Sequence, residues 1–313
     1  MDAKSRAGIT PPRAPRRPLT SIQHGIARVD DYAWLRAENW QAVMRDPGAL
    51  APDIRAQLEA ENAYTLGLMA DTEELQQQLF TEMKERIKED DSSVPAPDGS
   101  FSYYTRFVTG GQHPLFCRLP RDGGDEQILI DGNALAKDHA YFRISNVAHS
   151  PDHRLIAYAV DTKGSEFSTV HVVEAATSAV IDSHIPDNNG NFEWASDSRT
   201  LLYVWLDDEH RPRKVLSHAI GADGQDALVH EQPDPAYFLG LSETQSRRYL
   251  LLNASDHETA EIRLVDTKDL SAAPRLVSAR EPEHDYSVEH HDDRLIILTN
   301  SDGAEDYRIV EAP

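Results

Sequence analysis

The stretch HSPDHRLIAYAVD (149–161) joins a polar turn to an apolar strand, and the chain repeats this pattern. Three further clear copies are WASDSRTLLYVWLD (194–207), LSETQSRRYLLLNASD (241–256) and VEHHDDRLIILTNSD (288–302). The copies align on four arginines that lie 45, 49 and 46 residues apart: Arg154, Arg199, Arg248 and Arg294. A more divergent copy, APDGSFSYYTRF (96–107), precedes them. A repeat of about 40–50 residues built from short strands is typical of a β-propeller.

Each repeat contains strand-like segments in the same order. An aromatic-led segment comes first, at 141–150, 191–196, 237–244 and 286–291. A turn and a segment rich in Leu, Ile and Tyr follow it, and then a third strand. The fourth strand is expected at 179–185, 227–232 and 274–280. Four antiparallel strands form one propeller blade. A β-sandwich with chance spacing is the alternative, but four registered copies exceed what a sandwich requires.

We therefore predict a mainly β protein, a partial β-propeller of four complete four-stranded blades and part of a fifth. The first blade is expected at about 99–140, and the fifth begins at 285 with three strands before the sequence ends. An extended and helical segment precedes these blades.

The first 90 residues have a different pattern. Four prolines within eight residues predict an extended segment over residues 1–30: Pro11, Pro12, Pro15 and Pro18. Helical spacing of apolar residues predicts one helix over 53–69 and a second from Asp71 to about 90. The second helix carries an apolar stripe that needs a partner: Leu75, Leu79, Met83 and Ile87. The polar stretch KEDDSSVPAPDG (88–99) places a boundary between a 1–90 segment and a 91–313 propeller.

Composition narrows the function classes. The 313 residues carry a formal charge of −22, which argues against nucleic acid or an anionic membrane as a partner. The charge suits a basic substrate, although a solvated acidic surface is the more ordinary explanation. A single cysteine, Cys117, excludes an intramolecular disulfide framework. Without an apolar transmembrane run or a signal-peptide core, we expect a cytoplasmic protein.

The sequence offers no catalytic motif. The nearest string to a Gly-x-Ser-x-Gly nucleophile elbow is Gly240-Leu241-Ser242-Glu243-Thr244, which lacks the second glycine and is expected on a blade strand. No GxGxxG, P-loop, His-Glu-x-x-His or EF-hand loop is present. We therefore predict no catalytic and no cofactor-binding residues, and no cofactor, for these 313 residues.

Histidines and acidic clusters are the residue types here that could bind a metal ion. His290 and His291 are adjacent on a strand, so their side chains point to opposite faces, and His284 lies nearby. His149 and His153 flank a turn and could ligate together, but ordinary turn histidines are the better interpretation. Asp207-Asp208-Glu209 and Asp292-Asp293 are expected in turns, where carboxylates accept backbone amides. We predict no metal ligands.

Five separated strings resemble the oligopeptidase B group of the prolyl oligopeptidase family of serine peptidases. They are HGIARVDDYAWLRAENW (24–40), MKERIKEDDSSVPAPDG (83–99), GGQHPLFCR (110–118), DDEHRPRKV (207–215) and DHETAEIRLVD (256–266). The resemblance runs from about residue 11 to the end. It implies a helical N-terminal segment and a seven-bladed propeller that caps a C-terminal α/β-hydrolase domain with a Ser-Asp-His triad. It also implies cleavage of short peptides after Lys or Arg, with folded proteins excluded.

The resemblance covers only the N-terminal part of that family. None of its catalytic residues has a matching position here, so the resemblance implies a non-catalytic portion whose partner is the absent hydrolase domain. A stand-alone propeller that binds a partner or serves as a scaffold is the alternative, but it would need a complete ring and a polar terminal blade. A metal-dependent propeller enzyme such as a lactonase would need ligands recurring in several blades, and the sequence shows no such recurrence.

Overall fold

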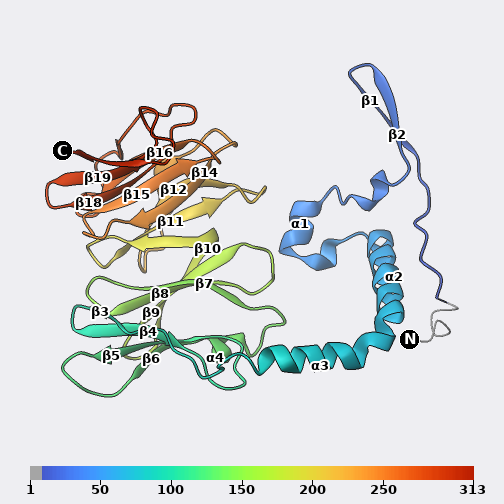
Figure 1. The fold of residues 1–313 in the computed structure, drawn as a ribbon, viewed down its shortest axis with the longest axis horizontal. Coiled ribbons are helices and arrows are strands. Elements are labelled where there is room, and N and C mark those ends of the chain that lie inside the picture. The colour runs from blue at the N-terminus through green and yellow to red at the C-terminus, as the bar shows by residue number, and fades with distance from the viewer. Residues whose placement is uncertain (1–8) are drawn as a thin grey trace. The chain divides into compact units, whose positions relative to one another are not determined.

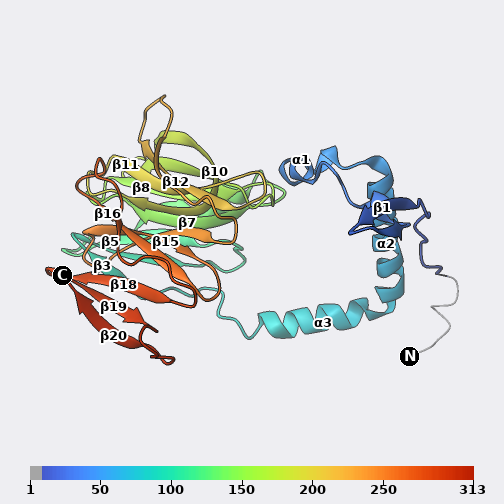
Figure 2. The same cartoon turned by 90° about the horizontal axis from the view of Figure 1, so that it is seen from above.

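The computed structural model describes residues 9–313, which divide into two compact units. The first unit ends at Asp91 and the second runs from Ser92 to Pro313. The first unit holds a hairpin and helices, and the second consists almost wholly of antiparallel strands (Figures 1 and 2).

The first unit begins with a β-hairpin, formed by β1 (Leu19–Gln23) and β2 (Ile26–Asp30). Its two turn residues, His24 and Gly25, have φ angles of 53° and 77°. Positive φ at both central residues matches the two-residue turns that suit the twist of a hairpin. The predicted extended segment over 1–30 therefore folds back on itself at residue 24, and its residues 1–8 lie outside the described residues.

The two predicted helices are confirmed as α2 (Pro52–Met69) and α3 (Glu73–Lys84), joined by the 3-10 turn η3 (Ala70–Thr72). Shorter elements precede them: η1 (Ala33–Leu35), α1 (Trp40–Arg45) and η2 (Pro47–Ala49). α3 ends at Lys84, several residues before the predicted end. Its apolar stripe is exposed, with Leu75 and Met83 at 47% and 58%. None of the described helices is long and apolar enough to cross a bilayer.

The second unit contains five blades in chain order. Blade 1 comprises β3 (Ala96–Asp98), β4 (Phe101–Arg106), β5 (Leu115–Pro120) and β6 (Gln127–Asp131), followed by α4 (Gly132–Ala136). Blade 2 comprises β7 (Arg143–His149), β8 (Leu155–Asp161), β9 (Ser168–Glu174) and the first part of β10 (Val180–Trp194). Blade 3 comprises the end of β10, β11 (Thr200–Leu206), β12 (Pro212–Ala219) and β13 (Ala227–Glu231). Blade 4 comprises β14 (Phe238–Glu243), β15 (Tyr249–Ser255), β16 (Ala260–Asp266) and β17 (Arg275–Leu276). Blade 5 comprises β18 (Tyr286–His291), β19 (Arg294–Thr299) and β20 (Arg308–Ala312).

The predicted partial propeller is confirmed, with two differences in its strands. Blades 2 and 3 share one seven-stranded sheet, because β10 runs without a break from one blade to the next. Asn188 pairs with Ser168 of β9 and with Trp205 of β11, and the register shifts between Asn188 and Phe192. The last strand of blade 4 is two residues long, where the sequence predicted 274–280.

Consecutive first strands lie against one another. The Trp194 indole of β10 donates to the carbonyl of Ala148 on β7, at 3.2 Å. On the other side of β10, the Asn191 amide donates to the Leu241 carbonyl of β14 and accepts from its N–H, both at 2.7 Å. The first strands therefore form the inner side of the blade arc. Apolar side chains fill the space between blades, with Phe192, Leu202 and Leu250 fully buried.

A candidate site at the inner ends of the blades

The turn between the first and second strands is built the same way in three blades. Arg154, Arg199 and Arg248 each come directly before the second strand of their blade. The carbonyl of each arginine accepts the N–H of the residue that directly follows the third strand of the same blade. Arg294 likewise begins β19, although its turn is shorter and pairs His291 with Arg294. The prediction of equivalent turn positions is therefore confirmed for Arg154, Arg199 and Arg248, whereas Arg294 is the first residue of its strand.

We call the end of the first strand, where this turn begins, the inner end of the blade. The same position of each repeat lies at or near this end. The residue five places before each aligned arginine is the last of the first strand in blades 2, 3 and 4, and lies within β18 in blade 5: His149, Trp194, Glu243 and Glu289. Polar groups that are far apart in the sequence thus meet at the inner ends. They flank a hollow of about 260 Å³ whose lining includes His149, Glu193, Trp194, Glu243 and Arg247.

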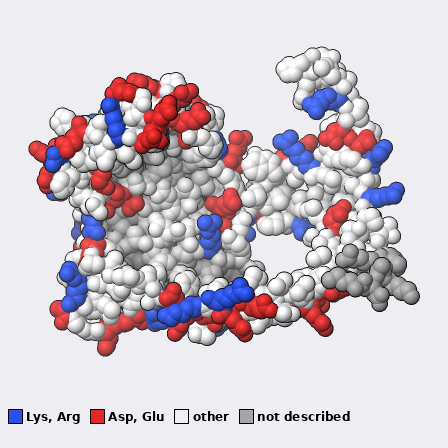
Figure 3. Space-filling model, in the orientation of Figure 1, with Lys and Arg blue, Asp and Glu red and all other residues white. Residues whose placement is uncertain are grey.

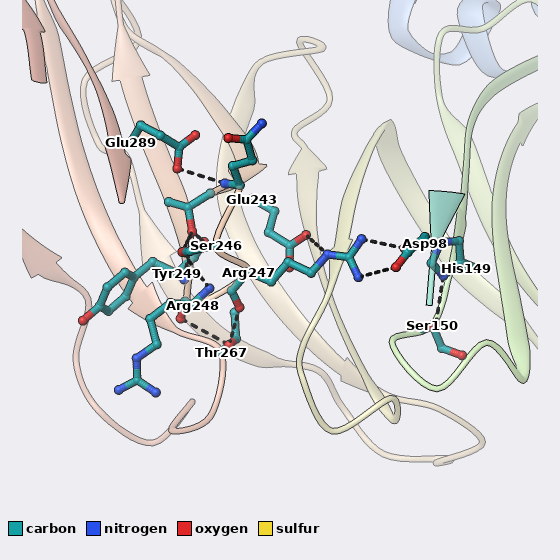
Figure 4. Close-up of polar contacts among 12 residues, drawn as sticks. Asp98, His149, Ser150, Glu243, Ser246, Arg247, Arg248, Tyr249, Thr267 and Glu289 are labelled. Atoms are coloured by element: carbon teal, nitrogen blue, oxygen red, sulfur yellow. Dashed lines mark hydrogen bonds and ion pairs between the residues drawn. The ribbon is translucent and has the colours of Figure 1, made fainter. Parts of the chain in front are cut away.

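Arg247 spans this site from blade 4 to blade 1. Its Nη1 and Nη2 lie 3.0 and 2.5 Å from Oδ1 and Oδ2 of Asp98, at the end of β3 (Figure 4). Its Nε lies 3.8 Å from Glu243. The hydrogen bonds from Arg247 lower the pKa of Asp98, so this carboxyl stays ionised well below neutral pH. The guanidinium therefore holds two blades that are not neighbours in the chain.

Two further carboxyl groups at the site are only partly exposed and resist ionisation. Burial raises the pKa of Glu193 to about 7, and the carboxylate of Glu243 adds to this shift. Burial also raises the pKa of Glu243, and Arg247 acts in the opposite direction. Glu289 accepts the N–H of Gln245 at 2.9 Å and so joins blade 5 to the turn of blade 4.

Between blades 1 and 2, aromatic rings and imidazoles stack at the same end. The Tyr103 and His149 rings lie 4.0 Å apart and nearly parallel. The Tyr103 hydroxyl lies 2.9 Å from Nδ1 of His153, and Arg118 Nη1 donates to the His153 carbonyl at 2.7 Å. Burial lowers the pKa of His149, despite the neighbouring Asp98 carboxylate.

Asp98, His149 and His153 form one group of potential metal ligands. One ligand atom from each lies within 4.8 Å of the others. The spacing of the two histidines around a turn permits a shared metal ion, although ordinary turn histidines are the better interpretation of the sequence alone, and nothing in the sequence connects them with Asp98. That aspartate belongs to the divergent first copy of the repeat, so its position at the inner end was not readable from the alignment.

Other residues singled out in the sequence do not converge. His290 Nδ1 contacts Ser246, His291 lies beside Asp292, and His284 contacts Thr299. Asp207 accepts the N–H groups of Glu209 and Arg211, as expected of a turn carboxylate. The string 240–243 lies within β14, so no nucleophile elbow forms there. Cys117 is 1% exposed, and burial raises the pKa of its thiol to about 11.

The surface of the second unit is unevenly charged. Acidic side chains gather at the upper end in Figure 3, around the strand that Figure 1 labels β16, while the hollowed middle of this face carries fewer charges. A larger hollow of about 940 Å³ lies elsewhere, beside His218 on the outer strands. Residues of blades 2 and 3 line it, whereas residues of blades 2, 3 and 4 line the hollow at the inner ends.

Comparison with known proteins identifies the fold and its relatives. The family model described as "Prolyl oligopeptidase, N-terminal beta-propeller domain" matches residues 12–313. Dipeptidyl aminopeptidase BI of Pseudoxanthomonas mexicana is 33% identical over 98% of this chain and 44% of its own length. Protease 2 of Moraxella lacunata is 28% identical over 96% of this chain and 43% of its own length.

Solved structures agree. Oligopeptidase B from Leishmania major superposes with a TM-score of 0.88 at 27% identity, over 98% of this chain and 45% of that one. Oligopeptidase B from Trypanosoma brucei, in a closed form with covalently bound antipain, gives 0.84 at 28% identity, over 96% and 44%. The chain thus spans less than half the length of these relatives. The resemblance found in the sequence is confirmed, and the chain belongs to the prolyl oligopeptidase family, whose N-terminal β-propeller domain it represents.

Proposed function

We propose that this chain is the substrate-gating portion of a peptidase that hydrolyses short peptides after Lys or Arg. In this proposal a C-terminal α/β-hydrolase domain supplies the catalytic serine, and the protein acts in the cytoplasm. The chain itself provides the propeller, and its 313 residues are a fragment of the working enzyme. Support comes from relatives that are named as peptidases and are more than twice as long as the region they share with this chain.

One structural observation carries the preference for basic peptides. The inner ends of four blades carry four carboxyl groups: Asp98, Glu193, Glu243 and Glu289. Glu193 and Glu243 line the hollow, Asp98 is joined to Glu243 through Arg247, and Glu289 is joined to the turn of blade 4 through Gln245. Arg247 pairs with Asp98 and lies 3.8 Å from Glu243, so the carboxyl groups named here outnumber the guanidinium groups that pair with them. Above the raised pKa values of Glu193 and Glu243, where both carboxyl groups are ionised, a surface of this sign favours the entry of cationic peptides over anionic ones, because it raises their local concentration.

A second candidate follows from the relative that is 33% identical, which is named a dipeptidyl aminopeptidase. An enzyme of that kind removes dipeptides from a free N-terminus, whereas an endopeptidase also accepts a blocked N-terminus. The inner carboxylates are compatible with either, since a free α-amino group and a basic side chain are both cationic.

The test uses the product of the complete reading frame and three chromogenic substrates. An N-blocked peptide ending in Arg, the same peptide ending in citrulline, and an unblocked dipeptide distinguish the possibilities. Cleavage of the blocked Arg peptide but not of its citrulline analogue supports the first proposal. Cleavage of the unblocked dipeptide alone supports the second.

The isolated 313-residue chain is the matched control. It contains no nucleophile elbow, so we expect no hydrolysis of any of the three substrates. Turnover that follows this chain through purification and responds to serine-directed inhibitors would overturn the proposal that it is non-catalytic.

A further inference from the structure

Asp98, His149 and His153 are held at one place by three different local structures. Asp98 ends β3, His149 ends β7, and His153 lies in the following turn with a φ of 62°. The side chains of Asp98 and His149 are 17% and 19% exposed, so both are largely withdrawn from water. His149 Nε2 lies 3.0 Å from Asp98 Oδ2. Neighbouring ligands of a tetrahedral ion with bonds of about 2.0–2.1 Å lie about 3.4 Å apart.

The hydrogen bond on the other side of the His149 ring fixes its tautomer. Nδ1 lies 3.0 Å from the carbonyl oxygen of Ser150. A carbonyl oxygen only accepts, so Nδ1 carries the hydrogen and the neutral ring has its lone pair on Nε2. That lone pair faces a carboxylate oxygen, which is also an acceptor. Two acceptors at 3.0 Å require a positive group between them, either a proton or a metal ion.

The arrangement around the two imidazoles is the one seen around metal ligands. Ligating histidines almost always donate their second N–H to a carbonyl, carboxylate or water, which orients the ring. The Ser150 carbonyl does this for His149. The Tyr103 hydroxyl holds the His153 ring from its Nδ1 side. Gly99 leaves room for this ring, because a Cβ built there would lie 2.4 Å from His153 Nε2.

Arg247 competes for the same carboxylate. It contacts both oxygens of Asp98, including the Oδ2 atom that faces His149 (Figure 4). A dication bound there would be repelled by a guanidinium a few ångströms away. We propose that Asp98, His149 and His153 form a site for Zn²⁺ or a similar first-row dication, and that this ion competes with Arg247 for Asp98.

The choice of ion follows from the donor atoms. Two imidazole nitrogens and one carboxylate oxygen suit Zn²⁺, Co²⁺ and their neighbours, whereas Ca²⁺ and Mg²⁺ prefer oxygen alone. The site is independent of the hydrolase chemistry proposed above.

The experiment is a Zn²⁺ titration by calorimetry of the complete reading-frame product, supported by the absorption spectrum of bound Co²⁺. We expect one site per chain whose affinity falls about a hundredfold or more in His149→Gln and in His153→Gln. His290→Gln is the matched control, since His290 lies on β18 and contacts Ser246 rather than Asp98. The proposal would be overturned if all three substitutions weakened Zn²⁺ binding equally, or if none of them weakened it.

Arg247→Met tests the competition. We expect about tenfold tighter Zn²⁺ binding than in the unmutated protein, because a competing cation is removed. Arg248→Met is its control, because Arg248 pairs with Asp266 instead. Zn²⁺ binding that appears only in Arg247→Met still supports the site, provided that adding His149→Gln abolishes it. Absence of binding in both proteins overturns the proposal.

A measurement without substitutions covers the case in which the variants fail to fold. Crystals of the unmutated protein soaked in Zn²⁺ should give an anomalous peak between Asp98 and His149. Peaks found only at other histidines would show an adventitious ion and would overturn the proposal.

Discussion

Arg247 and Asp98 form a bidentate ion pair across 149 positions of the sequence, with nitrogen–oxygen distances of 3.0 and 2.5 Å. The pair joins the turn of blade 4 to the innermost strand of blade 1, and intervening blades lie between them in the chain. It therefore fixes the separation of the inner ends that line the candidate site. Its Asp98 side is largely buried, while Arg247 remains half exposed.

We expect Arg247→Met and Asp98→Asn each to lower the free energy of unfolding by about 1 kcal/mol, because charge-assisted bidentate bonds exceed ordinary surface pairs but solvent screens the arginine. A double-mutant cycle measured by urea denaturation should give a coupling of similar size. Arg154→Met, at an exposed arginine of the aligned turn, is the control and should change stability by less than about 0.5 kcal/mol. A coupling of zero would show that the pair is not formed in solution.

The sequence predicted which arginines share a position but not which arginine reaches the site. Arg248 aligns with Arg154 and Arg199, whereas Arg247 precedes it and was not singled out. Arg247 itself has a φ of 57°, and this left-handed backbone conformation directs its side chain. The equivalent turn residues His153 and Ser198 have similar angles. The repeat was recognised from the spacing of apolar residues, and that spacing does not predict a left-handed turn residue or the direction of its side chain.

The recurring acidic position was within reach of the sequence. Glu243 and Glu289 both lie five residues before an aligned arginine, so the alignment itself held the signal that the inner carboxylates recur. Asp98 was not within reach, because blade 1 departs from the repeat spacing. The fusion of two predicted strands into β10 also escaped prediction. The string PDNNGN (186–191) has the residues of a turn, with positive φ at Asp187 and Gly190, yet Asn188 pairs with strands on both sides and the strand continues.

Glu193 gives a pH-dependent prediction. Its folded pKa of about 7 lies above the ordinary value of 4.5, so the folded state binds the proton more tightly than the unfolded state. Its contribution to stability is therefore lost as pH rises from about 4.5 to 7 and beyond. We expect Glu193→Gln to raise the free energy of unfolding by about 1–2 kcal/mol at pH 8.5, relative to the unmutated protein, and to have little effect at pH 4.5.

Thermal melts at the two pH values decide this prediction. Glu289→Gln is the control. Glu289 Oε1 accepts the N–H groups of Gln245 and His290, so this change should not raise the melting temperature at pH 8.5. A Glu193→Gln variant that melts lower than the unmutated protein at pH 8.5 would contradict the assignment of Glu193 as a carboxyl that resists ionisation.

His218 gives a pH dependence on the outer strands. Burial opposes its charged form, but Asp182 at 2.8 Å and Asp226 at 2.7 Å outweigh this effect and raise its pKa above 6.5. The stabilisation by the charged ring is fully present below pH 6.5 and is lost as pH rises through the raised pKa. His218→Gln should therefore cost about 1–3 kcal/mol at pH 6 and less at pH 9, by urea denaturation. An equal cost at both pH values would contradict a charged ring between the two carboxylates.

Asn191 tests how blades 3 and 4 are joined. Its side-chain amide both donates to and accepts from the backbone of Leu241, as a neighbouring strand would. Asn191→Ala leaves a buried N–H and a buried carbonyl without this partner, so we expect a loss of about 2 kcal/mol in unfolding free energy. Gln225→Ala, at an exposed position, should have little effect. A loss below about 0.5 kcal/mol would show that water replaces the amide.

The acidic inner ends predict a salt-dependent specificity constant in the complete enzyme. Attraction between exposed charges is screened beyond about 8–10 Å at ordinary salt, so kcat/KM for an Arg peptide should fall severalfold between about 20 and 200 mM salt. The citrulline analogue has nearly the same shape without the charge, and its kcat/KM should stay constant. The assay belongs at pH 8.5, where Glu193 is ionised in the folded state. In a Glu193→Gln/Glu243→Gln variant the salt dependence for the Arg peptide should weaken, because two of the carboxylates that attract it are gone. If the Arg peptide shows no salt dependence in the unmutated enzyme, these carboxylates do not draw substrate inward and serve only to hold the blades.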